Sequence, residues 1–229
     1  EEQLQQLVDI FNGSQDHRGL FATMYLVITR RAIRERDLYL QNGNKQAAAF
    51  EEKLLVNFAN KYFQTLMTDD PPEVWRMAFD SGRRSQNTGL KESGNIAEIL
   101  ALSMNAHIIH DLTLALAESG YDPNDPLHSA TFDGFNKTLF EEKDNILVAI
   151  HQAYGNNVVQ QANDLFGPAG DWIMQNLFRM MRRVAAVNSD AAREEIIHKT
   201  LLLGDAIVRL IPGGQLPTDV EFNIDEVGE

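Results

Sequence analysis

The chain has 229 residues, a formal net charge of −13 and no cysteine. Its 44% hydrophobic content is enough for one large domain with a proper core, which excludes disorder as the overall state. The acidity disfavours nucleic acid as a partner, because binding the phosphate backbone needs clustered lysine and arginine. The lack of cysteine excludes disulfides, thiolate metal sites and cysteine nucleophiles.

No window of the sequence contains the roughly 20 uninterrupted apolar residues of a membrane span. The most apolar stretch is interrupted by Asn105, His107, His110 and Asp111. We therefore expect a soluble, cytoplasmic protein without a membrane span. A removed leader stays open as an alternative, since the first residue is not methionine.

Apolar residues recur at helical spacing in segment after segment, beginning with Leu4, Leu7, Val8 and Phe11. Glycine and proline separate these segments, and neither an internal repeat nor an alternation of strands and helices is present. We predict an all-α fold: a single-domain bundle of about seven or eight helices in residues 1–214, followed by an acidic tail. The expected helices are 1–12, 20–40, 45–67, 73–84, 96–116, 135–154, 171–186 and a last one that begins near 190.

The bundle is predicted to form around one buried central helix, residues 96–116, which is apolar on nearly every side. Asn105, His107, His110 and Asp111 lie within it. His107 and Asp111 are four residues apart and project from the same face, with His110 beside them. Because an unsatisfied polar group in a core costs about 1–3 kcal/mol, these groups must be paired, hydrogen-bonded or metal-bound.

Two functional interpretations of His107 and Asp111 follow from their chemistry. Imidazole and carboxylate groups are metal ligands, so the pair would hold a divalent metal, the one cofactor that the sequence suggests. Without a metal, Asp111 would orient His107 so that its free nitrogen serves as a catalytic base. In both cases the residues expected to complete the ligand pocket are Tyr25, Arg30, Asn105, His110 and His151.

The structural interpretation of the same pair stays open as well. In it, His107 is a neutral, hydrogen-bonded core residue, and Asp111 pairs with an arginine of the predicted second helix, such as Arg30 or Arg31. The sequence therefore leaves two classes of function. One is an enzyme that acts on a small molecule through a His–Asp acid/base or metal site, and the other is a non-catalytic ligand-binding or protein-interaction module.

The stretch MNAHIIHDL (104–112) resembles the Met-Asn-Ala-His-Ile-x-x-Asp-Leu signature of a largely bacterial family catalogued only as a domain of unknown function. The resemblance extends to DHRGLFATMYLVITR (16–30) and to TFDGFNKTL (131–139). It implies a shared fold and pocket, with no established activity. Thr131 and Phe132 depart from it, since the family tends to have Asp and His there, and a metal site built on those two would be lost. The matching positions are Asp16, Arg18, Phe21, Tyr25, Asn105, His107, Asp111, Asp133 and Asn136.

The acidic tail, residues 215–229, shows a different pattern. Val220, Phe222 and Ile224 alternate with polar residues, as in a strand that lays apolar side chains into a groove. The groove would belong to the same domain or to a neighbouring subunit, so a homodimer is the predicted assembly. A disordered tail is the equal alternative, given its acidity and terminal position.

Overall fold

The computed structural model describes residues 1–88, 95–155, 168–186 and 189–210. These residues form helices joined by short turns and contain no strand, so the all-α prediction is confirmed. If α5, η1 and α6 are counted as one continuous helix, these ranges contain nine helices, slightly more than predicted. They are α1 (Glu2–Ser14), α2 (Gly19–Gln41), α3 (Lys45–Met67), α4 (Glu73–Thr88), α5 (Asn95–Met104), η1 (Asn105–Asp111), α6 (Leu112–Ser119), α7 (Pro126–Glu141), α8 (Lys143–Tyr154), α10 (Pro168–Ala186) and α11 (Asp190–Leu210).

The additional helix comes from the region after the central helix. The sequence pattern predicts one helix over 135–154, whereas the structure has α7 and α8, and α7 already begins at Pro126. Asp125 caps α7, because its side-chain oxygen accepts a hydrogen bond from the backbone N–H of Leu127 at 2.8 Å. Proline suits the first position of a helix, where its missing N–H would have no partner.

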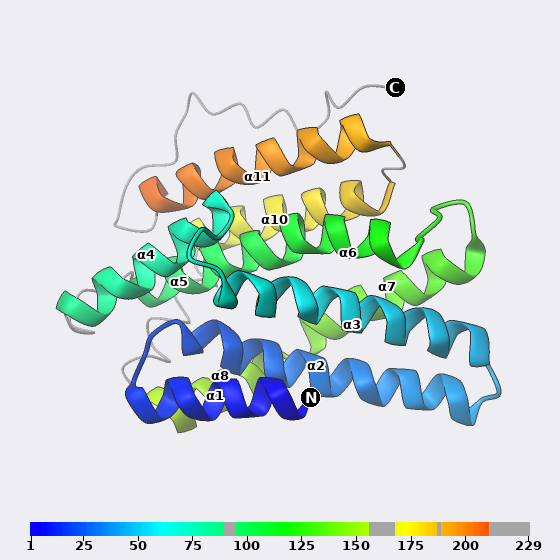
Figure 1. Cartoon of the computed structure of the whole chain (residues 1–229), viewed down its shortest axis with the longest axis horizontal. Helices are drawn as coiled ribbons and strands as arrows, with labels where there is room; N and C mark the ends of the chain where they lie inside the picture. Colours follow the sequence, from blue (N-terminus) through cyan, green and yellow to red (C-terminus); the bar gives the residue numbers. More distant parts are fainter. Residues whose placement is uncertain (89–94, 156–167, 187–188, 211–229) are drawn as a thin grey trace.

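The central helix runs between two groups of helices (Figure 1). On one side α2 and α3 pack against it, with α1 and α8 packed on α2, and on the other side lie α10 and α11. The helices α2 and α3 run antiparallel in Figure 1, as their short link predicts, and Gly43 in that link has φ +77°. With neighbours on opposite sides, the central helix must be apolar around most of its circumference.

The predicted burial of this central helix is confirmed. Every residue from Asn105 to Asp111 is buried. By length and composition the helix Ile96–Ser119 would be able to cross a membrane, but 89% of its most apolar window is buried inside the protein. Its position in the core therefore accounts for its apolar character.

The middle of the central helix departs from the expected continuous α-helix. Residues Asn105 to Asp111 form a π-helix, in which the backbone hydrogen bonds reach one residue further than in an α-helix. Such segments are rare and frequently mark functional sites. Asn105, His107, His110 and Asp111 all lie in this segment.

The tail, 215–229, lies outside the described residues, and so does the boundary at residue 214 that the sequence predicts for the helical domain. The predicted tail contact and the homodimer therefore stay predictions.

Candidate functional site

Asp111 forms the centre of a buried cluster of hydrogen bonds. Its Oδ2 accepts from the indole Nε1 of Trp75 at 3.0 Å and lies 2.9 Å from the Nδ1 of His107. Its Oδ1 lies 2.9 Å from the Nδ1 of His110. The expected pairing of Asp111 with Arg30 or Arg31 is wrong, because these three groups from α4 and η1 occupy the carboxylate.

The protonation of this cluster follows from its contacts. Burial by itself raises the pKa of Asp111, but hydrogen bonds from His107 and His110 outweigh burial, and the pKa lies below its ordinary value. Asp111 is therefore a carboxylate at neutral pH. Because a carboxylate can only accept hydrogen bonds, the Nδ1 atom of each histidine carries the hydrogen.

The second ring nitrogen of His107, Nε2, is buried and has no hydrogen-bond partner among the described residues. Burial lowers the pKa of His107 below its ordinary value, although the neighbouring Asp111 acts in the opposite direction. His107 is thus a neutral imidazole at physiological pH. With its hydrogen on Nδ1, it keeps a free lone pair on Nε2.

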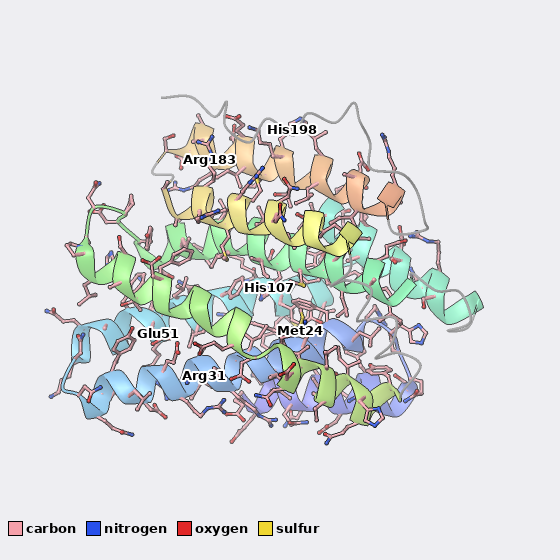
Figure 2. All side chains as sticks on the ribbon, turned by 180° about the vertical axis from the view of Figure 1, so that it is seen from behind. Met24, Arg31, Glu51, His107, Arg183 and His198 are labelled. Atoms are coloured by element: carbon pink, nitrogen blue, oxygen red, sulfur yellow. The ribbon has the colours of Figure 1, made fainter. Side chains whose placement is uncertain are left out.

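Five aromatic side chains surround this imidazole, and we call them the aromatic box. Phe58 stacks on the ring of His107, with 3.7 Å between the ring centroids and 8° between the planes. Tyr25 meets the ring edge-on at 4.4 Å. Figure 2 shows His107 in the middle of the molecule. The box consists of Phe21 and Tyr25 from α2, Phe58 and Tyr62 from α3, and Trp75 from α4.

Tyr25 and His110 lie beside the pair, but three other predicted pocket residues do not. Asn105 is buried, yet its Nδ2 donates to the backbone carbonyl of Thr200 at 2.8 Å and so anchors η1 to α11. Arg30 binds Glu1 at 2.8 Å near the start of the chain, with 42% of its side chain exposed. His151 is exposed on α8. Arg30 and His151 are therefore removed from the candidate pocket.

A metal bound by His107 and Asp111 together does not suit this geometry. The two residues face each other through a hydrogen bond, and both carboxylate oxygens already accept from donors. No group of three or more histidine, aspartate or glutamate side chains in the described ranges is arranged to hold a metal ion. Nε2 of His107 keeps a lone pair that no described residue uses.

A second buried ionisable group outside this cluster is the carboxyl group of Glu51 on α3. It is 1% exposed, and neither carboxylate oxygen has a hydrogen-bond partner in the described part of the chain. Burial, with a smaller contribution from the charge of Glu35, raises its pKa to about 8. Glu51 is therefore largely protonated at neutral pH.

Apart from Tyr25, which was predicted as a pocket residue, the aromatic residues of the box were visible in the sequence only as core positions. Phe21 and Tyr25 are four residues apart, as are Phe58 and Tyr62, which is the spacing of one helix face. Nothing in that spacing indicates that both faces meet His107. Nothing in the sequence predicted that the indole N–H of Trp75 donates a hydrogen bond to Asp111.

A family model described as "Family of unknown function (DUF5995)" matches residues 1–199. No curated protein and no solved structure matches the chain significantly. The matched range contains Asp111, both histidines bound to it and the whole aromatic box. Since the match covers most of the 229 residues, the chain belongs to this family of unknown function.

Proposed function

We propose that the protein is an enzyme that performs acid/base chemistry on a small molecule, with His107 as the general base and Asp111 as the group that orients it. The observation that carries this proposal is the buried Nε2 of His107, which has no partner among the described residues. The anchored Nδ1 fixes the ring and leaves Nε2 as the atom that takes a proton.

The energetics support a role beyond packing. Leaving a buried polar atom without a partner costs about 1–3 kcal/mol, and native cores rarely keep such atoms. The hydrogen bond from Nδ1 to Asp111 accounts for a histidine at position 107, but it does not require Nε2 to stay without a partner. A neutral imidazole held against a carboxylate is also the form that a general base needs.

The alternative is a ligand-binding or protein-interaction module in which the pair is structural. It is favoured by the three donors around Asp111, of which the indole of Trp75 would hold α4 against η1 in any folded state. The two proposals differ in what they require of Nε2: the enzyme uses this atom, whereas the structural role needs only Nδ1.

Two variants separate these requirements. In His107→Asn the side-chain amide can replace Nδ1 as the donor to Asp111, but no atom of the asparagine reaches the position of Nε2. In His107→Gln the amide reaches the position of Nε2 instead. A library of small metabolites is screened by thermal shift, since a ligand of the folded state raises the melting temperature. The enzyme proposal expects compounds that stabilise the wild type and fail to stabilise His107→Asn.

Chemical modification tests access to Nε2 without a known substrate. Diethyl pyrocarbonate acylates the free nitrogen of a neutral imidazole, and peptide mapping resolves the six histidines of the chain. His17 is the matched control, since it is also buried and its Nδ1 is bound to Ser85. We expect His107 to react faster than His17. No reaction at His107, together with a screen that yields no His107-dependent ligand, would establish the structural role.

Elemental analysis of the purified protein addresses the metal hypothesis. Stoichiometric zinc, iron or manganese that is lost in His107→Asn would replace the metal-free base by a Lewis-acid site. A metal content that does not change in the variant would leave the acid/base proposal as it stands.

A further inference from the structure

Tyr62, whose ring belongs to the same aromatic box, carries a second buried polar atom without a partner among the described residues. The hydroxyl of Tyr62 has no hydrogen-bond partner among the described residues, and the residue is 0% exposed. The ring of Tyr62 lies 5.8 Å from that of His107 and 5.1 Å from that of Trp75, between centroids. A tyrosine hydroxyl buried in a core ordinarily finds a partner, and a phenylalanine would pack as well without one.

These two atoms, which have no partner in the described part of the chain, have complementary chemistry. Nε2 of His107 can only accept a hydrogen bond, because the hydrogen of the ring is held on Nδ1. The hydroxyl of Tyr62 can donate one. Burial raises the pKa of Tyr62 well above its ordinary value, and the nearby charge of Arg18 offsets this only in part, so the phenol keeps its proton.

We infer that Tyr62 is the second polar group of the His107 site, and that the site takes a small, uncharged carbonyl compound with an apolar body. This inference rests on the proposed function. An aromatic box favours an apolar body, one acceptor suits an acidic C–H or O–H group, and one donor suits a carbonyl oxygen. The stacked Phe58 covers a face of the imidazole, whereas the lone pair of Nε2 lies in the ring plane.

The chemistry that this pair supports is proton transfer next to a carbonyl. Nε2 of His107 takes the proton from the carbon beside the carbonyl group, and the electron pair of that C–H bond becomes a carbon–carbon double bond. The carbonyl electron pair moves onto oxygen, where the hydroxyl of Tyr62 stabilises the enolate by a hydrogen bond. The imidazolium then returns the proton to the enolate carbon, where a C–H bond forms again and the carbonyl group is restored, so the step needs no oxidant, reductant or second substrate.

The probe is 2-naphthol, a planar apolar phenol whose oxygen resembles an enolate oxygen. Its hydroxyl can donate to Nε2 of His107, and its oxygen can accept from Tyr62. Its binding is measured by fluorescence titration with the wild type, Tyr62→Phe and His107→Asn. We expect the wild type to bind 2-naphthol and Tyr62→Phe to bind it about tenfold less tightly, as for one lost hydrogen bond.

The matched control is Tyr154→Phe. Tyr154 lies outside the aromatic box, and its hydroxyl donates to the backbone carbonyl of Asp16 at 3.0 Å. Tyr154→Phe loses a hydrogen bond that is made in the folded protein and should have a lower melting temperature. Tyr62→Phe loses none, so its melting temperature should equal or exceed that of the wild type. A fall in Tyr62→Phe comparable to that in the control would overturn the inference.

The titration distinguishes failure of the inference from failure of the proposed function. Binding that is lost in His107→Asn and unchanged in Tyr62→Phe would remove Tyr62 from the site and keep His107 as the base. Absence of 2-naphthol binding in the wild type would overturn the carbonyl class. The proposed function itself would then still be decided by the reactivity of His107 toward diethyl pyrocarbonate.

Discussion

Replacing Asp111 by alanine should destabilise the protein by several kcal/mol. The substitution removes a carboxylate that accepts hydrogen bonds from Trp75, His107 and His110 in a site where Asp111 is 1% exposed. The donors that remain are the indole N–H of Trp75 and the Nδ1–H groups of the two histidines. Within the described residues these donors bond only to Asp111.

The magnitude follows from the exposure of each donor. Trp75 and His107 are 0% and 1% exposed, so each leaves an unsatisfied N–H that costs about 1–3 kcal/mol. The side chain of His110 is 11% exposed and can turn toward water, so it adds little. Release of the buried charge offsets part of the loss. The expected net cost is about 3–5 kcal/mol, the range for removing one member of a buried, hydrogen-bonded charge pair.

Urea unfolding at pH 7 measures this cost as the difference in free energy of unfolding. Because the pKa of Asp111 lies below its ordinary value of 3.8, its stabilisation is fully present above that pH and is lost only on further acidification. Asp80→Ala is the control, since Asp80 is an exposed partner of Arg83 on α4 and its loss should change stability by no more than about 0.5 kcal/mol. A cost of less than about 1 kcal/mol for Asp111→Ala would show that the N–H groups of Trp75 and His107 do not stay unsatisfied in the variant.

Three further predictions concern other parts of the chain. Glu51 has a pKa of about 8 in the folded protein and an ordinary value of 4.5. The folded state therefore holds a proton that the unfolded state releases, and the free energy of unfolding should fall by about 1.4 kcal/mol for each unit by which the pH rises from 4.5 to 8. Glu51→Gln should lack that fall in pH-dependent unfolding, and parallel profiles would contradict the prediction. Gly19→Ala should cost about 1–3 kcal/mol in urea unfolding, since the new methyl would meet the hydroxyl of Tyr154 and the Cβ atom of Phe11, while Gly13→Ala, with open space around it, should be neutral or stabilising. Deletion of 215–229 should lower both the molecular mass of the assembly and the melting temperature, and no change in either would show that the tail has no structural role.

The sequence by itself determined the helical architecture, because hydrophobic periodicity and helix-breaking residues are local signals. It also determined the contact between His107 and Asp111, since a spacing of four residues places them together on any helix, whether regular or π-type in detail. The same kind of argument predicted the buried position of the central helix. A segment with so few polar residues is stable only when neighbouring helices cover it.

Only the tertiary structure decided what else reaches this pair. Trp75 lies 36 residues from Asp111 in the sequence, and its hydrogen bond depends on how α4 packs against η1. Arg30 and His151 were plausible neighbours by residue type, but a helical residue faces the core or the solvent according to the rotation of its helix, which packing decides. For the same reason the sequence did not show that Nε2 of His107 and the hydroxyl of Tyr62 would have no partner among the described residues. Whether a buried polar atom is satisfied depends on the groups of every helix around it.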